Sequence, residues 1–208
     1  VFALLAWVSG TQGVAALLDV VSLVIAVVLG CVVHVIVVHG VLIIKLSLRL
    51  SPVMFFRGAR DAMLVAFSTS SSSATLPVTM SVAEENLGIK PVVASTVLPL
   101  GATVSMDGTA AYLTVAVLYI ANLAGVALSF GDQVLLGITV VALSVGVAAL
   151  PSASLVMMVV ILNQIGLPVE YMALIVAVDR ILDMCRTSLN VTSDLIITKI
   201  IDESEKRR

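Results

Sequence analysis

The sequence predicts an all-α integral membrane protein that combines spanning helices with two re-entrant helical hairpins in an inverted repeat. Of the 208 residues, 60% are apolar and 12% are charged, about half the charged share of a soluble domain. The mean hydropathy is +1.19. Interruptions also recur along the chain, because Pro77 precedes Asp107 by 30 residues and Pro151 precedes Asp183 by 32. Paired interruptions of this kind are typical of inverted-repeat transporters with a midplane site.

Charge and cysteine content argue against several other classes of protein. A net charge of −2 gives no support for nucleic-acid binding. Cys31 and Cys185 lie in apolar runs, so we expect buried small hydrophobic side chains and neither a disulfide nor a metal pair. The chain opens on the apolar run VFALLAWV without a methionine or a polar leader. We therefore expect an N-terminal part of a longer protein to be missing.

Three stretches are long enough for spanning helices, which need about 20 predominantly apolar residues. Residues 14–48 form the first. Residues 91–128 form the second, which the polar sequence SMDGT interrupts at 105–109. Residues 168–200 form the third, and we expect it to span although it carries several charges.

Two further segments are expected to enter the membrane and return on the same side. Residues 52–87 contain the sequence STSSSSATLP at 68–77, and residues 134–167 contain GVAALPSAS at 146–154. Each half-segment has roughly 12–17 residues, too few to cross the hydrocarbon alone. Their turns expose backbone at membrane depth, which is tolerated where protein or a water-filled cavity surrounds it.

The distribution of basic residues predicts the orientation. The loops near residues 132 and 170 contain no Lys or Arg. By the positive-inside rule, the first hairpin and the C-terminus then face the cytoplasm and the second hairpin opens outward. The basic residues flank the first hairpin or end the chain, and they are Lys45, Arg49, Arg57, Arg60, Lys90, Lys206, Arg207 and Arg208.

The last helix carries the polar side chains that predict a binding site. An ionisable group at the membrane centre costs at least about 2.5–3.5 kcal/mol on insertion scales, so several on one face must line an enclosed polar site. At roughly 100° per residue, six polar residues share about 100° of arc. They are Asp179, Asp183, Arg186, Thr187, Asn190 and Asp194.

A carboxylate, a guanidinium and an amide on one face suit an amino acid with an additional carboxylate. Asp183 can hold an ammonium group, and Arg186 can bind a carboxylate through two parallel hydrogen bonds. The half-helix that begins after residues 71–73 offers free N–H groups and a positive dipole end to a second carboxylate. The alternative interpretation is an ion pair between Asp183 and Arg186 that only joins helices.

Asp107 and Asp194 have no obvious basic partner in the sequence. A buried unpaired carboxylate protonates unless a cation neutralises it, and carboxylates with unwound backbone carbonyls form hard-cation sites in broken transporter helices. Proton coupling through the same acids is the alternative, and a channel is another, although two occluding hairpin tips favour alternating access. His34 and His39 are expected to be structural or interfacial.

Four motifs in order, SSSSATLPVTM, PLGATVSMDGTAAY, ALPSAS and DMCRTSLNVTSD, resemble the dicarboxylate/amino acid:cation symporter family. That family includes excitatory amino acid transporters and archaeal aspartate transporters. The resemblance covers nearly the whole chain and implies a glutamate-transporter-type transport core. Its parts would be the end of spanning helix 5 (1–12), helix 6 (14–48), hairpin 1 (52–87), helix 7 (91–128), hairpin 2 (134–167), helix 8 (168–200) and a cytoplasmic tail (201–208).

The same resemblance implies a non-enzymatic function. The full-length protein would be a homotrimer in the cell membrane that moves aspartate or glutamate by an elevator-like alternating-access mechanism. Sodium would be the co-transported ion, with no other cofactor. A proton-coupled symporter of glutamate or a C4-dicarboxylate is the alternative.

The resemblance also implies roles for individual residues. The main carboxylate of the substrate would be bound by Ser71, Ser72 and Ser73 together with Asn190. The amino group would be bound by Asp183, with Thr187 beside it, and the side chain by Arg186 with Thr109. The hairpin tip that closes over the substrate would include Ala149, Leu150 and Ser154. For sodium, one site would use Gly101, Ser105, Asn190 and Asp194, a second Ser105 and Asp107, and a third the carbonyls of Thr103, Met106, Ser144, Val145 and Val147.

Three positions depart from the family pattern. Ser105 stands where asparagine is usual, which weakens the assignment of both sodium sites that include it. Ser70 and Met184 are neutral where many members carry an arginine, and Arg180, one helical turn earlier, is a candidate substitute. Leu113 occupies the position of a proton-carrying glutamate and cannot titrate, so we do not expect coupled proton and potassium traffic there.

Overall fold

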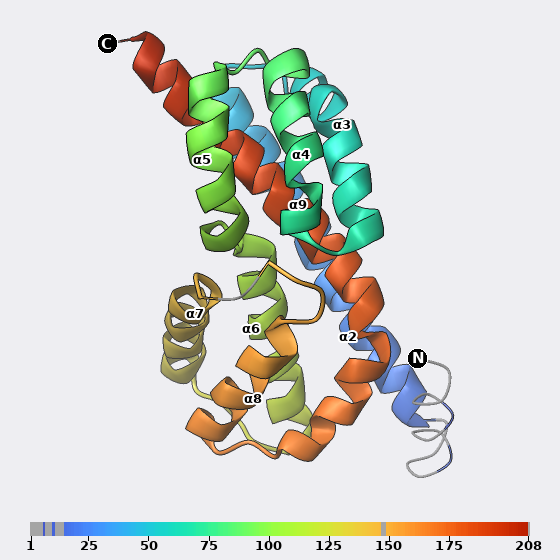
Figure 1. Ribbon diagram of the computed structural model, residues 1–208. Helices are drawn as coiled ribbons and strands as arrows, with labels where there is room; N and C mark the ends of the chain where they lie inside the picture. The colour runs from blue at the N-terminus through green and yellow to red at the C-terminus, as the bar shows by residue number, and fades with distance from the viewer. Residues whose placement is uncertain (1–5, 7–9, 11–14, 147–148, 208) are drawn as a thin grey trace.

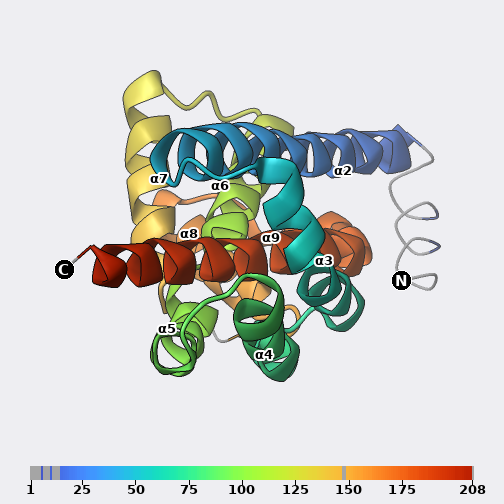
Figure 2. The ribbon, with the colours of Figure 1, turned by 90° about the horizontal axis from the view of Figure 1, so that it is seen from above.

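A computed structural model of the protein describes residues 6, 10, 15–146 and 149–207, and every regular element in these residues is helical. The all-α prediction is therefore confirmed. The longest helix, α9 (Met172–Lys206), runs through the length of the molecule (Figure 1). It contacts α2, α3, α4, α5 and α6. Seen from above, α2 lies along one side of α9, whereas α4 and α5 lie along the other (Figure 2).

Among the described residues, two segments are long and apolar enough to cross a membrane. Helix α2 (Ala15–Val33) continues without a break into η1 (His34–Ser47), a π-helix with i→i+5 hydrogen bonds. Of this pair, Val20–Ser47 has 28 residues and a mean hydropathy of 3.0. The second segment, Pro91–Leu123, has 33 residues and a mean hydropathy of 1.4. Many large apolar side chains of α2 and η1, such as Ile25, Leu29 and Ile36, are about half exposed, as expected of a surface that faces lipid.

The second of these segments consists of two helices. Helix α5 (Pro91–Val104) ends and α6 (Asp107–Leu123) begins on either side of Ser105 and Met106, within the polar SMDGT sequence. The Ser105 N–H still donates to the Gly101 carbonyl at 2.8 Å. This interruption places the carboxylate of Asp107 at the start of α6, where it accepts a hydrogen bond from the Gly108 N–H at 3.0 Å.

Helices α3 (Pro52–Thr69) and α4 (Ser72–Ser81) form a tight antiparallel pair (Figure 1). Ser70 ends α3 in the left-handed conformation with a φ of 54°. The Ser71 side chain caps α4 by accepting from the Ala74 N–H at 3.2 Å. Because one serine ends α3 and the next caps α4, the chain turns within the serine run. A short π-helical turn, η2 (Val82–Asn86), follows α4.

Helices α7 (Phe130–Ser144) and α8 (Ser154–Ile165) form a second pair. A capping box between Ser129 and Asp132 starts α7, and its hydrogen bonds hold the pKa of the exposed Asp132 carboxyl below its usual value. The short turn η3 (Val169–Tyr171) leads from α8 into α9. The turns of both pairs lie near the middle of the molecule (Figure 1), where the Ser71 hydroxyl donates to the Ala149 carbonyl at 2.9 Å.

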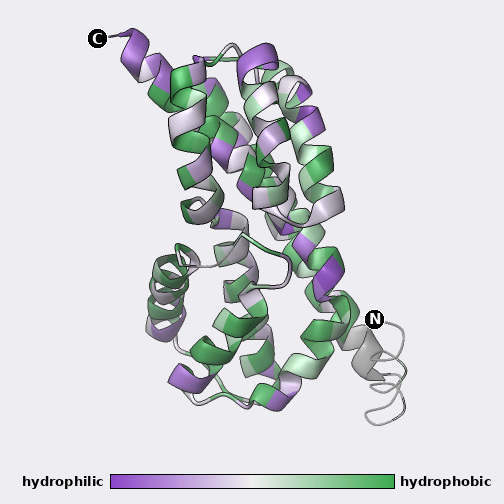
Figure 3. Ribbon diagram, in the orientation of Figure 1, coloured by the Kyte–Doolittle hydropathy of each residue, from purple (hydrophilic) through white to green (hydrophobic). Residues whose placement is uncertain are grey.

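Two apolar cores lie along α9. One packs residues of α2, α6, α7 and α8 against the first half of α9, with Tyr112 and Leu113 fully buried. The other packs α3 and α5 against its second half, where Ala59, Ala62 and Ala66 allow close approach. Hydrophobic residues cover most of the ribbon, while hydrophilic ones appear at the C-terminal end of α9 and along its middle (Figure 3). The polar residues of α9 therefore lie between the two cores.

Candidate functional site

The polar face of α9 is enclosed by protein. Each of its six predicted side chains is no more than 4% exposed. A buried polar group without a hydrogen-bond partner costs free energy, so each of these side chains needs a partner. The groups that serve as partners therefore indicate what kind of ligand the site can bind. The six are Asp179, Asp183, Arg186, Thr187, Asn190 and Asp194.

Arg186 forms the centre of a charged network. Its Nε donates to Asp183 Oδ1 at 2.9 Å, and its Nη1 donates to Asp179 Oδ1 at 3.2 Å. The guanidinium carbon lies 4.3 Å from the centre of the Tyr112 ring, and the Tyr112 hydroxyl donates to Asp179 at 2.9 Å. Two carboxylates thus surround one guanidinium, and the excess negative charge suits a cationic group such as an ammonium.

The tip of the α7–α8 hairpin donates two hydrogen bonds into this network. The Ser152 N–H donates to Asp183 Oδ2 at 2.7 Å, and the Ser152 hydroxyl donates to Asp179 Oδ2 at 2.7 Å. Ser152 has a φ of 59°, a conformation that side chains other than glycine adopt at a cost. These donors take the positions that the N–H groups of a bound amine would need at the same carboxylates.

A small cavity of about 20 Å³ lies between the two hairpin turns and α9. That volume is enough for about one water molecule, so an amino acid enters only if a hairpin tip moves. The lining residues are Ser70, Ser72, Met106, Thr109, Ala149, Leu150, Ser154, Asp183, Arg186, Thr187 and Asn190.

Of the predicted substrate residues, Ser71 and Ser73 do not line this cavity. Ser71 is buried beside it through its bond to the Ala149 carbonyl, whereas the Ser73 side chain is exposed. Asp179, Tyr112 and Ser152 were not among the predicted substrate residues, although Asp179 was placed on the polar face. Tyr112 and Ser152 contact Asp179 across 67 and 27 residues of sequence, a separation at which the sequence gives no contact signal.

Asn190 connects the polar face to the start of α6. Its side-chain amide donates to the Thr109 hydroxyl at 3.1 Å, and its oxygen accepts from the Gly108 N–H at 2.8 Å. A Cβ at Gly108 would lie 2.6 Å from the Arg186 carbonyl. The helices therefore approach each other closely here, which positions Thr109 beside Arg186.

Asp194 is a buried carboxylate without a cationic partner among the described residues. It is 3% exposed, and its Oδ1 has no hydrogen-bond partner in the described part of the chain. The Ser105 side chain lies against this carboxylate. A Cβ at Gly101 would lie 2.8 Å from Asp194 Oδ1. Gly101, Ser105 and Asp194, three predicted sodium ligands, are thus adjacent.

We predict that Gly101→Ala reduces sodium binding, because the added methyl group occupies the space beside Asp194 Oδ1. In full-length protein, the sodium-induced rise in melting temperature should fall by at least half. Gly137→Ala is the matched control, because no atom lies within 4 Å of a Cβ at that helical position. An equal sodium-induced rise in both variants would contradict the placement of sodium at Gly101.

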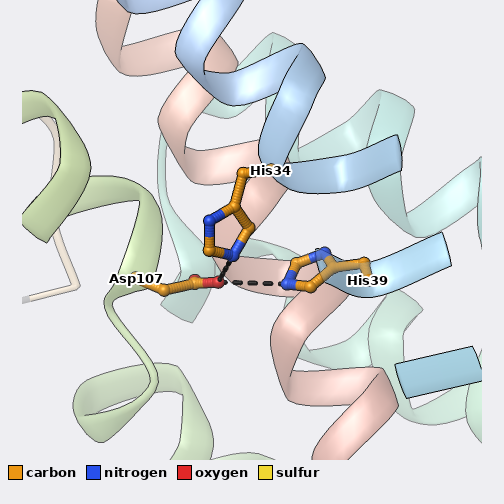
Figure 4. Close-up of side chains that lie close together, drawn as sticks. All are labelled: His34, His39 and Asp107. Atoms are coloured by element: carbon orange, nitrogen blue, oxygen red, sulfur yellow. Dashed lines mark hydrogen bonds and ion pairs between the residues drawn. The ribbon is translucent and has the colours of Figure 1, made fainter. Parts of the chain in front are cut away.

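Asp107 was expected to have no basic partner, but in the structure two histidines contact it. Its Oδ2 lies 2.9 Å from His34 Nε2 and 3.1 Å from His39 Nε2 (Figure 4), and the Ser193 hydroxyl donates to the same oxygen. Asp107 lies 68 residues after His39, so the sequence gives no sign of these contacts.

The remaining predicted sodium ligands are distributed around Asp107. Ser105, Met106, Ser144 and Val145 line the same open cavity as Asp107. The Thr103 side chain is exposed and donates to the Leu100 carbonyl at 3.0 Å. Val147 lies outside the described residues, as does most of the 1–12 segment.

Comparison with known proteins identifies the family. Residues 1–204 match the sodium:dicarboxylate symporter family. The chain belongs to that family. Its members are transporters and not enzymes, and the family membership implies a multi-pass protein of the plasma membrane with a membrane transporter fold. The resemblance inferred from the four sequence motifs is thus confirmed.

Curated excitatory amino acid transporters are more than 40% identical to the chain over the residues that align. An excitatory amino acid transporter of Caenorhabditis elegans is 48% identical over 160 residues, which is 77% of the chain and 32% of that protein. Human excitatory amino acid transporter 2 is 47% identical over 76% of the chain and 28% of its own length. Human excitatory amino acid transporter 1 is 42% identical over 86% of the chain and 33% of its own length. The chain spans about a third of the length of these relatives.

Proposed function

We propose that the full-length protein is a sodium-coupled symporter of acidic amino acids. The observation that carries this proposal is the enclosed site in which Asp183 and Arg186 lie beneath two hairpin tips. Fixed opposite charges at one site suit a substrate that carries both an ammonium and a carboxylate group. The relatives described above, named as excitatory amino acid transporters, support the same class of substrate.

The charged network suggests how substrate binds. Asp183 would hold the ammonium after it displaces the Ser152 N–H, and Thr187, which donates to Asp183 Oδ1 at 3.2 Å, would keep that carboxylate oriented. Arg186 would turn to the side-chain carboxylate near Thr109. The N-terminal turn of α4, which begins at Ser72, would receive the main carboxylate with Asn190.

Cation coupling rests on the carboxylates of Asp194 and Asp107. Asp194 with Asn190, Gly101 and Ser105 forms the proposed first sodium site, because oxygen ligands suit a hard cation and Asp194 needs a neutralising charge. Asp107 with Ser105 forms the proposed second site. The proposed third site uses backbone carbonyls of Thr103, Met106, Ser144, Val145 and Val147.

The placement in the membrane is part of the proposal. Helices α3–α4 and α7–α8 would be re-entrant hairpins that enter from opposite sides, with the C-terminus in the cytoplasm. The spanning helices would be residues 14–48, 91–128 and 168–200. We further propose that this core moves in an elevator-like manner against a framework within a homotrimer. The two hairpin turns that meet at Ser71 and Ala149 support a site reached alternately from the two sides.

Substrate competition tests the role assigned to Asp183. A dicarboxylate without an amine would add two negative charges beside Asp183 and Asp179, so aspartate should compete for labelled aspartate at a concentration at least about tenfold lower than succinate. The tenfold ratio corresponds to roughly 1.4 kcal/mol, a modest value for one buried charged contact. Equal competition by succinate would favour a dicarboxylate symporter and contradict the ammonium assignment.

A further inference from the structure

Two imidazole rings and a carboxylate converge on one point outside the substrate cavity. His34 Nε2 and His39 Nε2 lie 2.9 Å and 3.1 Å from the same oxygen, Asp107 Oδ2 (Figure 4). The rings are perpendicular, with centroids 4.7 Å apart. The Ser193 hydroxyl completes the group at 2.8 Å from His39 Nε2. We propose that these side chains form a binding site for a divalent transition-metal ion of the zinc class, which would take Asp107 in place of the sodium ion of the proposed second site.

The π-helix η1 is what brings the two histidines together. His39 lies five positions after His34, and in an α-helix residues with this spacing point about 140° apart at roughly 100° per residue. A π-helix joins residue i to residue i+5 and therefore places them one above the other. Irregular helical turns of this type occur often at functional sites. The histidines thus face Asp107 together because the helix winds differently from His34 onward.

The donor atoms select the class of metal. Imidazole nitrogens suit Zn²⁺, Cu²⁺ and Ni²⁺, whereas sodium and calcium prefer oxygen ligands. The ligating atoms of His34, His39 and Asp107 all lie within 4.8 Å of one another. With metal–ligand bonds of about 2.0–2.1 Å, a tetrahedral ion needs ligand atoms roughly 3.3 Å apart. The pair of ligand atoms farthest apart therefore has to move closer by up to about 1.5 Å to hold the ion, with Ser193 or water as the fourth ligand.

The surroundings of His39 support a ligand role. Its ring is 2% exposed, and its Nδ1 has no hydrogen-bond partner among the described residues. A buried structural histidine normally has both nitrogens satisfied, but the polar contacts of this ring are all made through Nε2 at the cluster. His34 and Asp107 are about one quarter exposed. They border an open, largely apolar cavity of about 780 Å³, through which an ion can reach them.

Metal binding by purified full-length protein tests the proposal. Zn²⁺ is titrated in competition with a chromophoric chelator, and Co²⁺ binding is followed by its visible absorption. His34→Gln and His39→Gln should each weaken Zn²⁺ binding by at least about tenfold. Removing a group that only hydrogen-bonds to a metal ligand already weakens binding by about 10–100-fold, and removing the ligand itself should cost no less. Cys31→Ser and Cys185→Ser are the controls and should bind as the unaltered protein does. Undiminished binding in either histidine variant, or no binding by the unaltered protein, would overturn the proposal.

X-ray absorption of the zinc-loaded, unaltered protein provides a readout that does not depend on the variants folding. A first shell of nitrogen and oxygen with two imidazoles supports the site, whereas a shell that contains sulfur or lacks imidazole overturns it. Neither measurement requires transport. A negative result would therefore leave the proposed symport untouched, and a protein that binds zinc without transporting aspartate would leave the metal site intact.

Discussion

Replacement of Arg186 by alanine is expected to abolish high-affinity binding of acidic amino acids. Arg186 is 2% exposed and is the guanidinium that balances Asp179 and Asp183. Loss of a buried charge-assisted partner costs roughly 2–5 kcal/mol, so aspartate affinity should fall by at least about thirtyfold. Equilibrium binding of labelled aspartate to the purified full-length protein measures the change. Neutral amino acids are then tested as replacement substrates, because the side-chain pocket loses its charge.

The same substitution also leaves two buried carboxylates without their cation, and removal of one partner of a buried pair typically destabilises a protein by about 3–5 kcal/mol. Arg186→Lys separates the two effects, because it keeps the charge but loses the planar pair of donors. The Arg186→Lys variant should remain folded but bind aspartate more weakly than the unaltered protein. Arg207→Ala is the control, at the exposed residue that ends the same helix. Unchanged aspartate affinity in folded Arg186→Lys and Arg186→Ala would remove Arg186 from the substrate site.

Replacement of Asp194 by asparagine is expected to remove most of the sodium dependence of substrate binding. The carboxylate is buried and has no cationic partner in the described residues, so a bound cation would provide its neutralising charge. By the same estimate of roughly 2–5 kcal/mol for a buried charged partner, the sodium concentration for half-maximal aspartate binding should rise at least about thirtyfold. In the absence of sodium, the free energy of unfolding of Asp194→Asn should equal or exceed that of the unaltered protein, because a buried charge is removed.

The exposed capping residue Asp132 provides a matched control for this change. Asp132→Asn removes one negative charge from the start of α7, at a position away from the proposed cation sites. Its sodium dependence should equal that of the unaltered protein. If Asp194→Asn keeps the original sodium dependence while remaining folded, Asp194 does not bind sodium.

The sequence predicted the helical fold and most of the residues that line the enclosed cavity, because both depend on local patterns. The polar face of α9 follows from helical periodicity, and its burial follows from the cost of exposing charges to lipid. The serine run around Ser71 and the proline at position 151 mark turns through residue types that favour them. The matching family motifs added the identities of Thr109 and Ala149, which periodicity alone does not select.

The contacts that the sequence did not predict depend on long-range packing or on unusual backbone. Tyr112 reads as a core residue in α6, and only the packing of α6 on α9 places its hydroxyl on Asp179. Ser152 reaches the same carboxylate because it adopts a positive φ. His34 and His39 meet at Asp107 because η1 is a π-helix, and a residue count based on an α-helix separates them. In each case the residue type was visible but its direction was not.

Uptake of labelled aspartate by liposomes that contain the purified full-length protein tests the proposed symport most directly. An inward sodium gradient at equal pH on both sides is compared with an inward proton gradient in sodium-free buffer. Sodium-coupled symport predicts concentrative uptake with the sodium gradient, none with the proton gradient, and loss of the signal in Arg186→Ala. Concentrative uptake that follows the proton gradient and is indifferent to sodium would contradict the proposed coupling.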